Sequence, residues 1–224
     1  MRYDVILMDI DNTLLDFNAG TRDSLQQLLA AHGLNLTLER EARFHVINDR
    51  LWKAYEHGEI EKHVIFETRF AEFLGELGIH TDPLEANAAY ARGLQQSAVL
   101  MPHATELLQR LQGKCRMFAV TNGVLTTQQP RLEKSGLNRY FEQVFISEQM
   151  GCKKPEKAFF DQVFAAIGPV DKSRCLLLGD SLTSDMQGGR NAGIATCYLG
   201  KDTGDPRCDY VIEDLLQLPE ILEM

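Results

Sequence analysis

The chain has 224 residues, of which 44% are hydrophobic and 25% charged, so it is long enough to bury a core and has an ordinary globular composition. Its net charge of −9 at pH 7 argues against a nucleic-acid partner. No apolar run approaches the roughly 18 residues of a membrane helix, and Asp4 and Asp9 interrupt the early apolar stretch that a secretory signal would need. We therefore expect no membrane partner. The five cysteines are odd in number and lack metal-ligand spacing, so we expect free thiols in a reducing cytoplasm, and we expect a monomer or weak homodimer.

The first predicted element is a buried strand over Val5–Met8, and two carboxylates follow it, Asp9 and Asp11. Side chains two residues apart lie on one face of a strand, so we expect both carboxylates to point the same way. Two adjacent anions cost free energy unless a cation neutralises them. A calcium-binding loop is excluded, because Leu14 and Gly20 stand where that loop needs a glycine and a glutamate.

Residues 18–97 show the periodicity of helices and no evident strand. Apolar residues recur at helical spacing in three stripes, and Asp82 followed by Pro83 predicts the start of a fourth helix. The stripes contain Leu25, Leu28 and Leu29, then Phe44, Ile47, Leu51 and Tyr55, then Phe66, Phe70, Phe73, Leu74 and Leu77. We expect an all-helical domain over 18–97, inserted into a core made of 1–17 plus 98–224.

The remaining chain alternates strands with single helices, which predicts a doubly wound α/β core with a mostly parallel, Rossmann-like sheet. Further strands are expected over Arg116–Val120, Gln143–Ser147, Cys175–Leu178, Ala195–Leu199 and Tyr210–Ile212. Helices are expected over Ala104–Leu111, from near Thr127 with Pro130 in the first turn, and from Pro155 to Ile167.

The first four predicted strands each lead into a different group of polar residues. Ligands of open α/β sheets bind at the carboxyl ends of the strands, so these residues are expected to converge. Taken singly, each group is an ordinary strand end, turn or helix start, and only their order and common placement point to one site. The groups are Asp9-Ile10-Asp11-Asn12-Thr13, Thr121-Asn122-Gly123, Lys153-Lys154-Pro155, and Gly179-Asp180-Ser181 with Asp185 beyond it.

These residue types suit phosphoryl transfer. Asp9 can attack phosphorus and form an aspartyl-phosphate, while Asp11 can protonate the leaving oxygen and later deprotonate water. Mg²⁺ prefers hard oxygen ligands, which Asp9, the backbone carbonyl of Asp11, Asp180 and water can supply, with Asp185 acting through metal-bound water. The Thr121 hydroxyl, the Asn122 backbone N–H and the Lys154 ammonium would hold the phosphoryl oxygens.

The four groups, in this order, resemble the motif set of the haloacid dehalogenase superfamily of aspartate-dependent phosphatases. The helical insertion after the first strand is similar to that superfamily's first type of cap. The resemblance implies that Asp9 is the nucleophile, Asp11 the acid/base, Thr121 and Lys154 phosphoryl ligands and Asp180 a metal ligand, with Asp185 ordering the metal site.

Longer stretches resemble the bacterial pyrimidine 5'-nucleotidase group, which removes phosphate from UMP, dUMP and dTMP. They are Asp16-Phe17, NDRLWKAYEHGEI, TNGVLTTQQPRLEKSGL, ISEQMGCKKPEKAFFDQVF and GDSLTSDMQGGRNAGIATCYL. This resemblance implies a Mg²⁺-dependent enzyme acting on a small phosphate monoester. Phe17, Trp52 and Tyr55 are candidates for contacting the base, although Trp52 and Tyr55 also fit the interior of the helical domain.

Several other functions use related sequences. A dehalogenase needs neither Asp11 nor Asp180, so the presence of both argues against it. A phosphatase for sugar phosphates or phosphoglycolate, or a phosphomutase, would carry the same motifs and stays open. A binding protein without catalysis is disfavoured because Asp9 and Asp11 are both retained.

Overall fold

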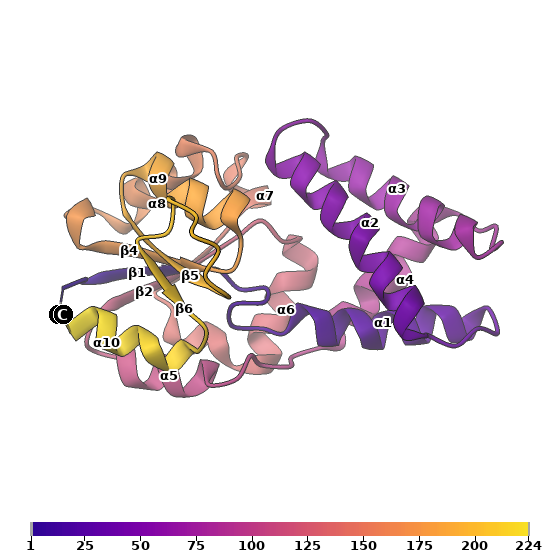
Figure 1. The fold of residues 1–224 in the computed structure, drawn as a ribbon, viewed down its shortest axis with the longest axis horizontal. Coiled ribbons are helices and arrows are strands. Elements are labelled where there is room, and N and C mark those ends of the chain that lie inside the picture. The colour runs from indigo at the N-terminus through magenta and orange to yellow at the C-terminus, as the bar shows by residue number, and fades with distance from the viewer. Residues whose placement is uncertain (1, 224) are drawn as a thin grey trace. The chain divides into compact units, whose positions relative to one another are not determined.

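A computed structural model describes residues 2–223 of the chain (Figure 1). The chain divides into two compact units, which we call the core unit (Met1–Phe17 with Ala98–Met224) and the helical unit (Asn18–Ser97). These ranges equal those expected from the sequence. That the two units act as a catalytic core and a substrate-selecting cap stays a prediction.

The core unit contains a six-stranded sheet in the order β3-β2-β1-β4-β5-β6, and every neighbouring pair is parallel. The doubly wound α/β fold expected from the sequence is therefore confirmed. Each predicted run forms a strand, with ends that differ by at most one residue. The strands are β1 (Val5–Met8), β2 (Arg116–Thr121), β3 (Gln143–Ile146), β4 (Cys175–Gly179), β5 (Ala195–Leu199) and β6 (Tyr210–Ile212).

Helices cover both faces of this sheet, because side chains of the central strands alternate between two apolar layers. Ile6 and Met8 pack in one layer with residues of α5 and α10, while Val5 and Leu7 pack in the other with residues of α8 and α9. Figure 1 shows these two pairs of helices on opposite sides of the sheet. The helices are α5 (Ala104–Leu111), α6 (Leu125–Ser135), α7 (Ser147–Met150), α8 (Lys157–Ile167), α9 (Gln187–Ala192) and α10 (Leu218–Glu223).

Two predicted helix starts are wrong. Helix α6 begins at Leu125, so Pro130 is its sixth residue and does not lie in the first turn. The extended residue Val124 caps this helix directly after the loop that follows β2, and the proline removes one backbone hydrogen bond from the helix interior. Helix α8 begins at Lys157 and not at Pro155, because Glu156, with φ −58° and ψ 131°, does not have helical backbone angles.

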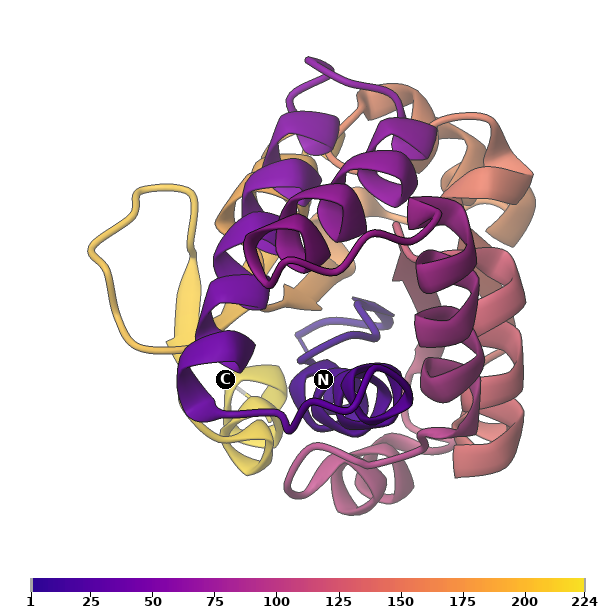
Figure 2. The same ribbon diagram turned by 90° about the vertical axis from the view of Figure 1, so that its right-hand side faces the viewer.

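The helical unit is all α, as the apolar stripes predict. Aromatic side chains from three of its helices form the interior, with ring centroids of Phe44, Phe70 and Tyr90 5.3–5.5 Å apart. Helices α2 and α3 run side by side (Figures 1 and 2). The helices are α1 (Phe17–Ala31), which starts in the core unit, α2 (Leu38–Glu56), α3 (Lys62–Glu76) and α4 (Pro83–Gln96).

Among residues 2–223, no helix combines the length and the apolar character needed to cross a membrane.

Candidate active site

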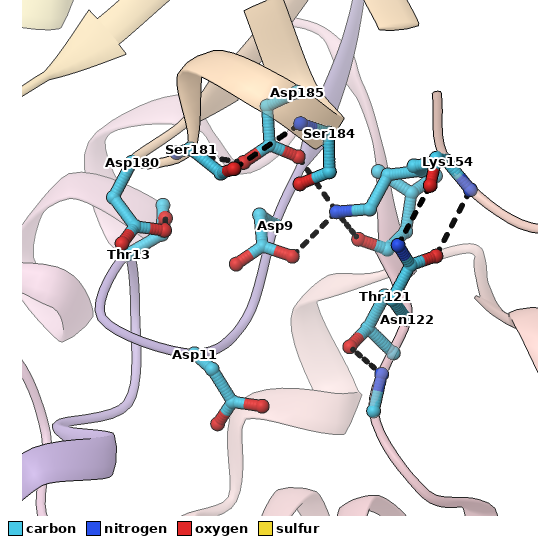
Figure 3. A network of polar contacts seen from close by, with 12 residues as sticks. Asp9, Asp11, Thr13, Thr121, Asn122, Lys154, Asp180, Ser181, Ser184 and Asp185 are labelled. Atoms are coloured by element: carbon cyan, nitrogen blue, oxygen red, sulfur yellow. Dashed lines mark hydrogen bonds and ion pairs between the residues drawn. The ribbon is translucent and has the colours of Figure 1, made fainter. Parts of the chain in front are cut away.

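The polar groups expected to converge do lie together at the carboxyl edge of the sheet (Figure 3). Parallel pairing places the last residue of β1 beside Ala119 of β2 and Leu178 of β4. The loops after these strands therefore start at one edge. The Asp9 backbone N–H donates to the Leu178 carbonyl, which fixes the start of the first loop against the end of β4.

Lys154 lies between two carboxylates in the centre of this edge. Its Nζ donates to Asp9 Oδ1 and Asp185 Oδ1, each at 2.6 Å, and to the Val120 carbonyl at 2.9 Å. All three ammonium hydrogens thus have an acceptor. Lys154 and Asp185 are each 1% exposed and Asp9 is 7% exposed, so the three charges are largely removed from water. One ammonium neutralises only one of the two carboxylates, so the buried group carries a net negative charge when both carboxylates are ionised.

Burial and the neighbouring charges shift the pKa values of the ionisable groups at this edge of the sheet. Burial raises the pKa of Asp9 to about 7; the Lys154 ammonium opposes this rise, and the Asp185 and Asp11 carboxylates add to it. Burial, together with Asp9 and Asp185, also raises the pKa of Asp180 well above its usual value. Burial lowers the pKa of Lys154, but the Asp185 and Asp9 carboxylates more than compensate and raise it. Lys154 is therefore the fixed cation of the site.

Three carboxylates form a group that fits a divalent cation. Asp9, Asp180 and Asp185 each offer one oxygen, and these oxygens lie within 4.8 Å of one another. Figure 3 shows the second Asp9 oxygen pointing toward Asp180, away from Lys154. Asp180 Oδ1 accepts a hydrogen bond from the Thr13 hydroxyl at 3.3 Å, which orients it. Oxygen donors and excess negative charge are what a hard cation such as Mg²⁺ requires.

Asp185 is held from two sides. Its Oδ2 accepts from the Ser181 backbone N–H at 3.1 Å, while Oδ1 accepts from Lys154. Gly179 leaves room for it, because a Cβ at Gly179 would come within 2.3 Å of the Asp185 carboxyl. Glycine at the end of β4 is thus required by close approach of this buried side chain.

Thr121, the last residue of β2, and Asn122, which follows it, form hydrogen bonds that connect different parts of the site. The Thr121 hydroxyl oxygen accepts hydrogen bonds from the Gly123 N–H and from Gln128 Nε2, each at 3.0 Å. The Asn122 side chain accepts from the Lys154 backbone N–H at 2.9 Å and donates to the Lys154 carbonyl at 2.8 Å. The Asn122 side chain therefore positions the loop that carries Lys154, a role that the sequence did not predict.

Asp9 and Asp11 both lie beyond the end of β1, so strand alternation does not set the directions of their side chains. Asn12 has a left-handed backbone with φ 57°, so the chain turns directly after Asp11. The Asp11 carboxylate lies outside the group of three metal-competent carboxylates. It contacts helix α6 instead, accepting from Gln128 Nε2 and from Arg131 Nη1, each at 2.5 Å.

Sequence reasoning missed Gln128 and Arg131. Both are 1% exposed although they lie in a helix that starts at the edge of the sheet. Polar side chains three residues apart lie on one face of a helix, and here that face is buried. The available signal was this polar pair at core-facing positions of the helix that follows Thr121-Asn122-Gly123.

The three candidate base-contacting residues lie in different surroundings. Phe17 is half-buried at the start of α1, and the Arg131 guanidinium carbon lies 5.8 Å from the centre of its ring. In the helical unit, the Trp52 and Tyr55 rings meet edge to face at 5.8 Å. The Lys62 ammonium lies 5.8 Å and 5.4 Å from the centres of these two rings. Tyr55 is buried and Trp52 half-buried.

Three known bacterial proteins are similar in sequence to this chain over most of its length. HAD-hydrolase YfnB of Bacillus subtilis is 37% identical over 201 residues, covering 90% of this chain and 86% of its own. Pyrimidine 5'-nucleotidase YjjG of Escherichia coli is 35% identical and covers 89% and 87%. Pyrimidine 5'-nucleotidase PynA of Streptococcus pneumoniae is 37% identical and covers 88% and 84%.

Comparison of the structure and of a family profile agrees with the sequence comparison. The crystal structure of YfnB, described as bound to magnesium and as revealing interdomain movement, superposes with a TM-score of 0.94 at 36% identity and covers both chains completely. A family profile, described as haloacid dehalogenase-like hydrolase, matches residues 3–193. The resemblance first suggested by the order of the motifs is thereby confirmed, and the chain belongs to the haloacid dehalogenase-like hydrolases.

Proposed function

We propose that this protein is a Mg²⁺-dependent phosphatase that hydrolyses nucleoside and deoxynucleoside 5'-monophosphates and prefers the pyrimidines UMP, dUMP and dTMP. The observation that carries the chemistry is the buried arrangement of Asp9, Lys154 and the acidic group Asp9–Asp180–Asp185 at one edge of the sheet. The nucleotide preference is supported by the similarity to the two pyrimidine 5'-nucleotidases.

In the proposed reaction, an oxygen of Asp9 attacks the phosphorus atom as the bond from phosphorus to the nucleoside oxygen breaks. Asp11 gives its proton to that leaving oxygen. Asp11 then removes a proton from water, which attacks the phosphorus of the aspartyl-phosphate, frees inorganic phosphate and restores Asp9. Thr121 and the Asn122 backbone N–H would hold the other phosphoryl oxygens and stabilise the charge that develops on them. Lys154 would join them by exchanging one of its three present acceptors for a phosphoryl oxygen.

The acidic group needs a cation before it can accept an anionic substrate. Asp9, Asp180 and Asp185 would hold Mg²⁺, which when bound supplies positive charge to the phosphoryl oxygens. Lys154 alone leaves net negative charge at this edge, and a phosphate would be repelled from it. The same requirement disfavours a dehalogenase, for which the acidic group has no use.

Mg²⁺ binding is expected to weaken as the pH falls through about 7, the pKa of Asp9 in the metal-free protein. Carboxylates with raised pKa values stabilise the metal-free fold when protonated, and this contribution is lost as the pH rises through those values. The Mg²⁺-induced increase in Tm should therefore be larger one pH unit above about 7 than one unit below it. Thermal unfolding with and without Mg²⁺ at the two pH values measures this difference.

Two variants and a turnover assay with EDTA test whether the increase in Tm reflects Mg²⁺ bound at the acidic group. Asp180→Asn should greatly reduce the Mg²⁺-induced increase in Tm, while Asp161→Asn, an exposed change on α8, should leave it intact. EDTA should stop turnover and added Mg²⁺ restore it. An enzyme indifferent to EDTA, or a Tm increase that is the same at both pH values, would contradict the assignment.

UMP, dUMP or dTMP is expected to be hydrolysed with kcat/KM about 10-fold or more above that for AMP or GMP, because a pocket shaped for one ring excludes a larger purine. Phe17→Ala should reduce this preference by about 5- to 100-fold if its ring stacks on the base. Phe17→Leu, which keeps apolar volume without an aromatic face, separates stacking from packing. Phosphate release over a panel of nucleotides provides the measurement.

Activity on p-nitrophenyl phosphate normalises each variant, since that substrate has no base to recognise. The panel should also contain sugar phosphates, phosphoglycolate and glucose 1-phosphate, with product analysis for isomerised glucose phosphate. Equal kcat/KM for purines and pyrimidines would remove the nucleotidase assignment and leave the phosphatase assignment standing. A clear preference for a sugar phosphate would replace the nucleotidase assignment with a sugar phosphatase, and an isomerised glucose phosphate would replace it with a phosphomutase.

A further inference from the structure

Helix α6 holds a closed polar network that reaches Asp11. Gln128 Nε2 donates to Asp11 Oδ2 at 2.5 Å and to the Thr121 hydroxyl at 3.0 Å. Arg131 Nη1 donates to Asp11 Oδ1 at 2.5 Å and to Gln128 Oε1 at 3.1 Å. Both Asp11 oxygens and both ends of the Gln128 amide are therefore engaged, so the orientation of each group depends on the other.

Arg131 is a buried cation whose ion-pair partner is more exposed than Arg131 itself. Its side chain is 1% exposed, whereas the Asp11 side chain that it pairs with is 26% exposed. Among residues 2–223, Asp11 is the acidic group with which Arg131 forms an ion pair, and the buried Arg131 Nε has no hydrogen-bond partner. Burying a cation with an unsatisfied donor costs free energy, and the ion pair with Asp11 offsets part of that cost.

The backbone around Asp11 is held by a bridge to Leu15, whereas the Asp11 carboxylate has little other support. Asp11 lies beyond the end of β1, next to Asn12, whose backbone is left-handed. Within the described residues, its carboxylate bonds only to Gln128 and Arg131. A group that transfers protons must stay within hydrogen-bond reach of the reacting oxygen, and an error near 1 Å can reduce the rate by about 10²-fold.

We propose that Arg131 and Gln128 are positioning residues for the proton-transferring carboxylate of Asp11, with Arg131 fixing its orientation and Gln128 linking it to Thr121. This inference rests on the proposed role of Asp11 in phosphate-ester hydrolysis. Arg131 acts through the Asp11 carboxylate, to which its Nη1 donates. Gly123 belongs to the same arrangement, because a Cβ there would lie 2.2 Å from Gln128 Nε2 and would displace the amide.

The consequence is a dependence on the leaving group. A substrate with a good leaving group, such as p-nitrophenyl phosphate, needs little protonation of the departing oxygen, whereas phenyl phosphate of nearly equal size needs more. Single-turnover phosphorylation with excess enzyme isolates the step in which the leaving oxygen departs. Arg131→Met should slow that step for phenyl phosphate about 10- to 100-fold more than for p-nitrophenyl phosphate. Arg110→Met, which removes an exposed arginine paired with Glu106, should change neither rate.

A double-mutant cycle separates positioning from folding. If Arg131 acts through Asp11, Arg131→Met should have little further effect on phenyl phosphate turnover in an Asp11→Asn background. Arg131→Lys keeps the charge without the planar guanidinium and provides the same cycle if the methionine variant does not fold. Turnover is expressed per folded molecule, measured by Mg²⁺-dependent binding of BeF₃⁻, whose proposed ligands Asp9, Thr121 and Lys154 are unchanged.

The outcomes are distinct. A selective loss on phenyl phosphate that disappears in the Asp11→Asn background supports the positioning role. Equal losses on both substrates, an undiminished loss without Asp11, or wild-type turnover per folded Arg131→Lys molecule would overturn it. A wild-type protein that releases no phosphate from any monoester with Mg²⁺ would instead refute the proposed function.

Discussion

Asp9→Asn is expected to reduce phosphate release from every substrate to background, which is the largest effect of any single change at this site. An amide nitrogen or oxygen cannot form the acyl-phosphate that the two-step reaction requires. The fold should survive, since the asparagine Oδ1 can still accept the hydrogen bond that Lys154 donates to Asp9. Steady-state turnover with Mg²⁺ and thermal unfolding of the same preparation measure the two properties separately.

Asp9→Ala serves as a second variant, because it cannot regain a carboxylate by deamidation. Asp161→Asn, at an exposed position on α8, is the matched control and should retain full activity. In the wild-type protein, BeF₃⁻ with Mg²⁺ should form its complex on Asp9. Substantial turnover by either Asp9 variant would refute the covalent mechanism, even if the protein is a phosphatase.

Lys154→Met is expected to combine a large loss of activity with a large loss of stability. It removes the cation between Asp9 and Asp185 and leaves two buried carboxylates facing each other. Removing one partner of a buried ion pair typically costs about 3–5 kcal/mol, and losing a charge-stabilising donor reduces kcat by about 10²–10³-fold. Chemical denaturation and single-substrate kinetics measure these effects.

The pH and metal dependence of this variant distinguish charge imbalance from a packing defect. The Lys154 ammonium opposes the rise in the pKa of Asp9, so without it Asp9 should take up a proton more readily and the destabilisation should shrink as the pH falls. Mg²⁺ should raise the Tm of Lys154→Met more than that of the wild type, because it replaces the missing positive charge. Lys157→Met, at an exposed lysine paired with Asp161, is the control and should behave as the wild type. A pH-independent loss of stability would point to packing.

The amino-acid sequence by itself determined the class of fold and the location of the site. Short apolar runs such as Val5–Met8 and Cys175–Leu178 form strands because both faces of a parallel sheet are buried. Parallel strands begin and end at common edges, so the polar residues that follow β1, β2, β3 and β4 had to meet once the sheet formed. The presence of Lys154 beside Asp9 was therefore predictable in outline.

The tertiary structure decided how the charges are paired. Strand periodicity placed Asp11 beside Asp9, but the chain leaves the sheet after Met8, and the orientation of Asp11 then depends on the surface that packs against it. That surface is helix α6, which contributes Gln128 and Arg131. More than one hundred positions separate these residues from Asp11 along the chain, and no local pattern in the sequence encodes such a contact. Sequence periodicity predicts which face a side chain occupies, whereas its partner across the site is fixed only when helix and loop pack together.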